Sequence, residues 1–170
     1  SFEPLQIDDD AIFAAALKRA GSGLLPVTRR LGQDEHASAN AAPVALPAGF
    51  AGSTRPVTPP VQTLPDQGLT LPTPRLAEAA AGTGFVDYVQ VDGVVRTLGL
   101  WRRSGERLYP QLGLSVACRL LEVPIERVRI TESATVLPDA RHPDGRTRDI
   151  RLPHLPEQRA APPGPARVLL

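Results

Sequence analysis

Asp87 and Arg96 are the pair of side chains whose charges and spacing in this sequence could contact a ligand or a partner protein. They flank Asp92 and Gly93 in the segment GFVDYVQVDGVVRTLGLW, residues 84–101. Alternating Val, Phe and Tyr around an Asp-Gly dipeptide, which tolerates positive φ, are typical of a β-hairpin with a two-residue turn. In that register Asp87 and Arg96 lie within diagonal reach on one face of the hairpin. Asp92 and Gly93 are expected to form the turn and to fix the strand register. The alternative is an ordinary hairpin whose exposed ion pair contributes little.

Three histidines, His36, His142 and His154, fall in segments that we expect to be loops. Asp139, His142 and Asp144 could be drawn together as metal ligands, although a solvated turn explains these residues more simply. The sequence contains no GxSxG, Walker, HExxH or Rossmann motif. We therefore expect no catalytic residues, no metal site and no cofactor in this chain.

The composition predicts one folded domain with long irregular connections. Hydrophobic residues make up 42% of the 170 residues, and there are 19 prolines. The net charge of +1 gives no case for nucleic acid or a membrane surface as a partner. The one cysteine, Cys118, excludes an internal disulfide and is expected to be a small core residue. Because the chain begins at Ser1 and contains no methionine, we expect it to be a piece of a longer protein.

The first expected helix follows Asp8, Asp9 and Asp10, which can cap its amino end and favour its dipole. Divalent metal binding is the alternative for these aspartates, but no further acidic ligands follow at loop spacing. Gly21 suits the left-handed residue that ends a helix. Apolar residues at helical spacing predict one buried stripe, formed by Ile12, Phe13, Ala16, Leu17 and Ala20.

Residues 23–29, GLLPVTR, predict a short strand that lies at a sheet edge or ends at Pro26, because proline cannot donate to a neighbouring strand. Residues 32–74 contain eight prolines, which exclude regular helix. Within this segment we expect residues 32–48 to be a mobile loop and the rest to be extended.

Pro74 is expected to open a short helix that ends at Gly82. We interpret Gly82-Thr83-Gly84 as a helix C-cap and turn, because a phosphate-binding glycine loop would require the reverse order of strand and helix. Residues 102–107, RRSGER, are expected to form a charged turn. Residues 110–122 predict the best helix, whose wide apolar face indicates that it is largely covered. Its polar stripe comprises Gln111, Ser115, Arg119 and Glu122.

Short strands are expected at residues 128–130, 134–137 and 147–152, with a polar turn at 139–145. The predicted fold class is α/β, with α+β as the alternative: a single-layer mixed sheet with a β-hairpin, packed against two or three helices and crossed by a long proline-rich loop. The domain is expected to span residues 1–152. Residues 153–170 form a proline-rich tail that we expect to be disordered, or ordered only by a contact.

Several motifs also stand in an order that matches a known pattern. An acidic lead into an alanine-rich helix is followed by LLPV, a proline-rich crossing, PRLAEAAAGTGFVDYVQVDGVVRTLGL and LYPQLGLSVACRL. Over roughly residues 8–152, this order resembles the CHASE type two family of extracytoplasmic sensory domains. The positions that carry the resemblance are Gly84, Asp92, Gly93, Arg96, Tyr109, Pro110, Leu112 and Leu114.

The resemblance implies a non-catalytic sensor: a periplasmic domain of a bacterial inner-membrane signalling protein, held between membrane segments. The attached output would be an adenylate or guanylate cyclase, or else a histidine kinase or diguanylate cyclase. A homodimer is implied for the full-length protein. The stimulus, an unknown small ligand or protein, would be received through residues 32–74 or the cleft beside the hairpin, with Arg96 and Asp87 as contacts.

Two departures from the family pattern stand out. The strand and helix that usually precede the acidic stretch are missing, so we expect an incomplete sheet, and a proline-rich tail replaces the usual last strand. Two other functions stay open: a non-catalytic protein-interaction module that uses a sheet edge or the proline-rich segment, and an accessory domain of a hydrolase.

Overall fold

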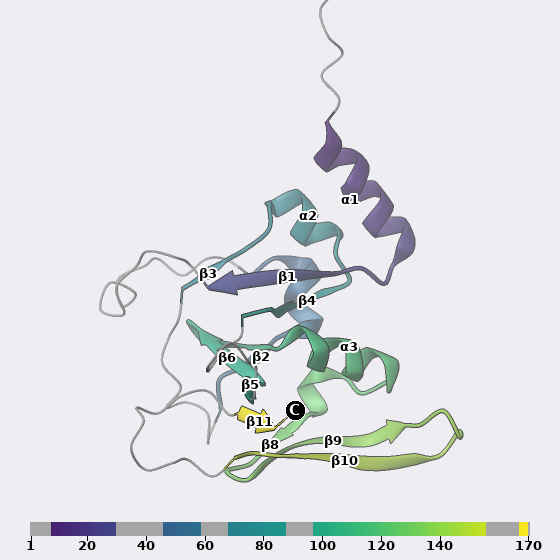
Figure 1. Ribbon diagram of the computed structural model, residues 1–170. Coiled ribbons are helices and arrows are strands. Elements are labelled where there is room, and N and C mark those ends of the chain that lie inside the picture. The colour runs from purple at the N-terminus through teal and green to yellow at the C-terminus, as the bar shows by residue number, and fades with distance from the viewer. Residues whose placement is uncertain (1–7, 30–45, 59–67, 88–96, 156–166, 170) are drawn as a thin grey trace, which may run out of the picture.

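The computed structural model describes residues 8–29, 46–58, 68–87, 97–155 and 167–169, in which helices alternate with short strands (Figure 1). The elements in chain order are α1 (Asp9–Ala20), β1 (Leu24–Arg29), η2 (Ala48–Ser53), β2 (Arg55–Pro56), β3 (Leu69–Thr70), α2 (Pro74–Ala79), β4 (Gly82–Phe85), β5 (Thr97–Gly99), β6 (Trp101–Ser104), β7 (Arg107–Pro110), α3 (Leu112–Leu120), η4 (Ile125–Arg127), β8 (Arg129–Ile130), β9 (Ala134–Arg141), β10 (Thr147–Pro153) and β11 (Arg167–Leu169). Helices η2 and η4 are 3-10 helices.

The strands of the described residues are distributed over four small sheets, with the orders β3-β1-β4, β10-β9-β8, β11-β5 and β2-β7-β6. The mixed α/β class is confirmed. The expectation that all strands join in one layer is wrong for the described part of the chain. Figure 1 shows α1 at one end of the molecule, the β9–β10 hairpin at the other, and α3 between them.

The predicted hairpin over residues 84–101 has its two ends in β4 and β5, which pair with β1 and β11 respectively. Among the described residues β4 and β5 are not paired with one another, so the predicted pairing of the outer parts of this hairpin is wrong. Asp92, Gly93 and Arg96 lie outside the described residues, so the turn itself stays a prediction. Near the end of the tail, residues 167–169 form β11, which lies antiparallel to β5. The sheet also continues past residue 152: β10 ends at Pro153, and the amide of His154 donates to Ser133 O over 2.8 Å.

Helix α1 begins and ends where the sequence predicts. Asp8 Oδ1 accepts a hydrogen bond from the amide of Ala11 over 3.0 Å, which confirms the capping role, and Gly21 ends the helix with φ +62°. The predicted buried stripe is wrong in part. Ala14 and Leu17 face the body, whereas Ile12 and Phe13 are 60% and 48% exposed.

Strand β1 passes through Pro26 and does not end there. It lies between β3 and β4, but β3 pairs only with Thr28 and Arg29. Carbonyl groups of Gly23 and Val27 accept from the β4 side. By alternation the nitrogen of Pro26 points away from β4, toward a side where β3 has no residue opposite, so no ladder hydrogen bond is lost.

The residues Gly82-Thr83-Gly84 form the buried strand β4, so their assignment to a helix C-cap and turn is wrong. Helix α2 already ends at Ala80, which is extended. A Cβ at Gly84 would lie 2.5 Å from Leu112 Cα, and one at Gly82 would lie 2.7 Å from Ser53 Oγ. These glycines therefore let α3 and η2 approach the backbone of β4.

Two segments that were expected to be irregular contain regular structure. Residues 48–53 form η2 where an extended chain was predicted, because no proline interrupts the sequence between Pro47 and Pro56. Residues 102–107 belong to the hairpin β6–β7 in place of a charged turn. Its two-residue loop is Gly105-Glu106, with Gly105 at φ +56°, a position that favours glycine.

The face that α3 buries is the opposite of the predicted one at three positions. Ser115, from the polar stripe, is buried against β4, whereas Leu120 is 76% exposed and Val116 is 40% exposed. The helix spans Leu112–Leu120, shorter than the predicted 110–122, because Pro110 still belongs to β7. Strand β9 in turn is longer than predicted and runs to Arg141.

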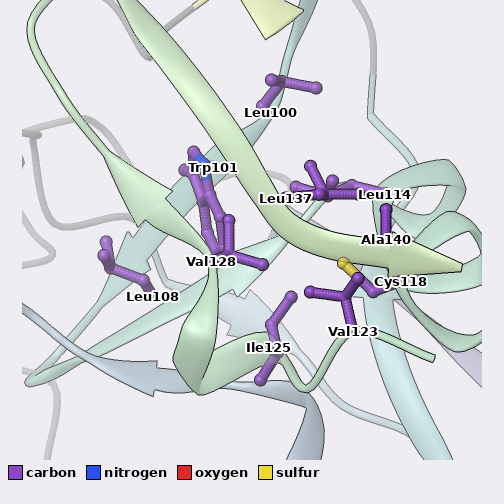
Figure 2. Close-up of a cluster of buried hydrophobic side chains, with 10 residues drawn as sticks. All are labelled: Leu100, Trp101, Leu108, Leu114, Cys118, Val123, Ile125, Val128, Leu137 and Ala140. Carbon is purple, nitrogen blue, oxygen red and sulfur yellow. The ribbon is translucent and has the colours of Figure 1, made fainter. Parts of the chain in front are cut away.

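Two clusters of buried side chains fill the molecule. The first, here called the α3 core and drawn in Figure 2, contains Leu100, Trp101, Leu108, Leu114, Cys118, Val123, Ile125, Val128, Leu137 and Ala140. The second, here called the β1 core, contains Leu17, Leu25, Val27, Phe50, Leu69, Ala77, Ala80, Phe85 and Tyr109. Strand β4 and helix α3 pack against one another where the two clusters meet.

Candidate ligand cavity between the two cores

A cavity of about 250 Å³ lies at the junction of the two cores. Its apolar wall includes Cys118, Val123 and Ile125 of the α3 core. Leu24 of β1 and Ser53 of η2 line it from the side of the β1 core. A small, mostly apolar cavity with a few polar side chains at its wall is typical of a site for a small molecule.

Thr83 takes part in three hydrogen bonds, two of which hold Ser53 and Ser115 at the polar wall of this cavity. Ser115 Oγ donates to Thr83 O over 2.7 Å, and the amide of Thr83 donates to Ser53 Oγ over 2.9 Å. Thr83 Oγ1 in turn donates to Leu25 O over 2.7 Å. One residue of β4 thus ties α3, η2 and β1 together. Because Thr83 and Ser115 are buried, their positions are fixed by both packing and hydrogen bonding, and Ser53 is half-buried.

Two charged side chains at the carboxy end of α3 line the cavity and bind different elements. Arg119 donates from its guanidinium to the carbonyl oxygen of Gly21, the residue that ends α1. Glu122 accepts from Arg141 Nη1 at both carboxylate oxygens, over 3.1 and 3.2 Å, at the end of β9. The cavity is therefore in contact with side chains that bind the amino-terminal helix and the carboxy-terminal hairpin.

Glu122 adopts φ +56°, a left-handed conformation that favours glycine. Its amide donates to Arg119 O and the amide of Val123 donates to Cys118 O, so Glu122 occupies the position after the helix end where glycine is usual. A residue with a side chain here costs on the order of 1–2 kcal/mol. That Glu is present despite this cost indicates that its side chain contributes something else.

Asp87, one of the two predicted contact residues, lies within 3.5 Å of Arg102 Nε through its Oδ2 atom. The guanidinium carbon of Arg102 lies 4.9 Å from the ring centre of Phe85, as expected for a cation–π contact. The Arg102 side chain is only 10% exposed. The other predicted contact residue, Arg96, lies outside the described residues.

Arg102 was missed by sequence reasoning because residues 102–107 were interpreted as a turn. The signal that would have found it is the dipeptide Gly105-Glu106 between two short runs of alternating residues, which is typical of a two-residue hairpin loop. That assignment moves Arg102 from the turn into β6, next to the buried Trp101.

The other residues considered as metal ligands are Asp139, His142 and Asp144, and each of them contacts a different group. Asp139 Oδ2 accepts from Arg127 over 2.5 Å, His142 Nδ1 lies 3.3 Å from Arg148 Nη2, and Asp144 Oδ1 accepts from the amide of Arg146. Asp139 lies within β9, so the predicted turn at residues 139–145 is wrong in its first part, whereas His142 and Asp144 lie in the connection between β9 and β10.

Cys118 is buried in the α3 core, as predicted. Burial raises the pKa of its thiol to about 12. The thiol is therefore protonated at neutral pH, which fits a small core residue and not a nucleophile.

His154 closes a chain of hydrogen bonds at the end of β10. The indole nitrogen of Trp101 donates to Thr135 Oγ1 over 3.2 Å, and Thr135 Oγ1 lies 2.9 Å from His154 Nε2. Because the indole can only donate, the Thr135 hydroxyl hydrogen is left for His154, whose Nε2 then accepts. Burial lowers the pKa of His154, in keeping with the neutral ring.

No protein-family model, curated protein or solved structure matches this chain. Among the described residues, no helix is both long and apolar enough to cross a membrane.

Proposed function

We propose that this chain is the extracytoplasmic sensory domain of a bacterial transmembrane signalling protein, and that its stimulus is a small molecule bound in the cavity between the two cores. The parent protein would be a nucleotide cyclase, or else a sensor kinase or diguanylate cyclase. The motif order described above supports this assignment. The observation that carries it is the placement of Arg119 and Glu122, which line the cavity and contact Gly21 at the end of α1 and Arg141 at the end of β9.

A sensor requires an element with two arrangements and a ligand that favours one of them. Here the junction between the two cores is that element. A ligand that draws Arg119 away from Gly21 removes a hydrogen bond at the end of α1. A ligand that draws Glu122 away from Arg141 removes the contact at the end of β9. Helix α1 and the β9–β10 hairpin would carry this change to the flanking segments of the parent protein.

The edge of β10 provides less support for a protein-interaction module. In the sheet order β10-β9-β8 this strand lies at an edge, where a partner strand could add. Its exposed residues include Arg148, Asp149 and Arg151. Charged side chains on an edge strand are a usual means of preventing such pairing.

The test uses two series of small amphipathic molecules, straight-chain monocarboxylates from butyrate to octanoate and the matching alkylamines. Their tails suit the apolar wall, and their head groups suit Arg119 and Glu122 respectively. Binding at about 100 times the dissociation constant adds about 2.7 kcal/mol of stability. For a chain of this size that corresponds to a rise in the melting temperature of about 5–10 °C.

Gly52→Leu provides the blocking variant. Gly52 lines the cavity, and a Cβ at this position meets no atom within 4 Å, so a side chain can start here without a backbone clash. Ala51→Leu, an exposed neighbour on the same 3-10 helix, is the matched control. We expect a rise in melting temperature for the wild type and Ala51→Leu but not for Gly52→Leu. An equal rise in all three chains, or none in any, contradicts the proposal.

A further inference from the structure

We propose that the outward face of α1 binds a second copy of this chain, with the two α1 helices antiparallel. The helix rests on the body through a narrow contact: Ala14 and Leu17 are buried, and Asp10 accepts from the hydroxyl of Thr73. Ile12 and Phe13 remain 60% and 48% exposed. Two adjacent large apolar side chains on one helix form an exposed patch, which marks a contact surface more often than a single exposed residue does.

The residues around this patch share one stripe of the helix. Asp9, Ile12, Phe13, Ala16 and Ala20 stand at i, i+3, i+4, i+7 and i+11, which is the spacing of one helical face. All of them are exposed except Ala16, which is half-buried. The large side chains lie toward the amino end of this stripe, and the alanines lie toward its carboxy end. Two such stripes related by a two-fold axis are self-complementary when antiparallel, because Phe13 of one copy then lies against Ala16 of the other.

Charge favours the same orientation. Within the chain Asp8 pairs with Arg75 and Asp10 accepts from Thr73, while Asp9 lies on the exposed stripe. In the antiparallel arrangement Asp9 of each copy lies near Arg19 of the other, and the helix dipoles are opposed. A parallel arrangement would place Asp9 against Asp9 and Arg19 against Arg19, which is destabilising. The second copy is therefore the occupant that both shape and charge favour.

The contact is small, so the association is expected to be weak in the isolated chain. A stable interface buries more than roughly 1,000 Å², which two helices of this length do not reach. We expect a dissociation constant on the order of 100 µM, at the weak end of protein association. Attachment to a membrane would raise the effective concentration well above the value in dilute solution.

The experiment is sedimentation velocity of the full chain from about 5 µM to about 1 mM, a range that brackets the expected dissociation constant. We expect a reversible monomer–dimer equilibrium that Ile12→Ser and Phe13→Ser each weaken at least tenfold, or about 1.4 kcal/mol. Asp9→Arg and Arg19→Asp should each weaken it several-fold, and the double variant should restore it. Lys18→Asp, a charge reversal on the same helix away from the stripe, is the matched control and should leave it unchanged. Circular dichroism verifies that each variant is folded.

Three results would overturn the proposal. The first is a monomer at every concentration, as when the residues that precede α1 cover the stripe within one chain. The second is a dimer that Phe13→Ser does not weaken, which places the contact elsewhere. The third is a double variant, Asp9→Arg with Arg19→Asp, that dimerises as weakly as the single variants, which excludes the antiparallel register. Ligand binding in the cavity is measured at about 5 µM, where the chain is monomeric, so the two proposals fail independently.

Discussion

Ser115 Oγ donates to the carbonyl oxygen of Thr83 across 2.7 Å, and this bond fixes the face that α3 turns toward β4. The helical pattern alone favours burial of the leucines and exposure of the serine. The structure does the reverse at Ser115 and Leu120, because Gly84 leaves room for the serine side of α3 to meet the strand. The close approach of α3 to β4 therefore determines which face of α3 is buried, and it also places Arg119 and Glu122 at the cavity.

Gly84→Ala tests this close approach. A Cβ there would lie 2.5 Å from Leu112 Cα and 2.8 Å from Leu112 N, both backbone atoms that cannot turn aside. We expect the free energy of unfolding to fall by about 3 kcal/mol, at the upper end of overpacking effects. Chemical denaturation provides the measurement. Gly52→Ala is the matched control, because its Cβ meets no atom within 4 Å, and it should change stability by less than about 0.5 kcal/mol.

Glu122→Gly and Glu122→Ala, compared with one another, isolate the backbone strain at the end of α3. Both variants lose the bonds to Arg141, but only glycine adopts φ +56° freely. We therefore expect Glu122→Gly to be more stable than Glu122→Ala by about 1 kcal/mol, measured by urea denaturation. Equal stability of the two variants would show that the left-handed conformation carries no cost here.

Arg102 is predicted to stabilise the fold through both its charge and its contact with the Phe85 ring. Removing one partner of a buried pair leaves the other charge uncompensated and typically costs about 3–5 kcal/mol. Because Asp87 is 24% exposed, we expect Arg102→Ala to cost about 2–3 kcal/mol, less than that range. Arg102→Met should cost less than Arg102→Ala, because methionine keeps an apolar contact with the ring. Thermal and urea unfolding of both variants measure the difference, and the reverse order would contradict this account.

His154 makes stability depend on pH in a defined direction. Its folded-state pKa lies below the ordinary histidine value of about 6.5, so the unfolded chain binds the proton more readily. The contribution of His154 is therefore fully present above about pH 6.5 and is lost as the pH falls below that value. Comparison of wild type with His154→Asn between pH 7.5 and about pH 5 should show a steeper loss in the wild type.

The sequence predicts elements whose determinants are local. The boundaries of α1 follow from Asp8 and Gly21, and β8, β9 and β10 begin within one residue of their expected positions. Strand β4 was missed because Gly82 and Gly84 are required by contacts with Ser53 and Leu112, which are distant in sequence.

The cavity residues likewise combine features that a local pattern predicts with contacts that depend on packing between distant segments. Arg119 and Glu122 were recognised as neighbours on one stripe of a helix, which is local information. Their bonds to Gly21 and Arg141 depend on how α1 and β9 pack, and no local pattern encodes this. The pairing of Asp87 with Arg102 was missed for the same reason, because it requires β4 and β6 to be placed in space.

The most direct test of the central claim, that occupancy of the cavity is communicated to both ends of the domain, is a nitrogen-edited amide NMR spectrum titrated with octanoate and octylamine. The amide of Ser22 reports on the carbonyl that Arg119 binds, and the amide of Arg141 reports on the contact with Glu122. The account predicts that one or both ligands shift both amides in the wild type and in Ala51→Leu, but neither amide in Gly52→Leu. Ligand-induced shifts confined to the exposed stripe of α1, or the same shifts in Gly52→Leu as in the wild type, would contradict it.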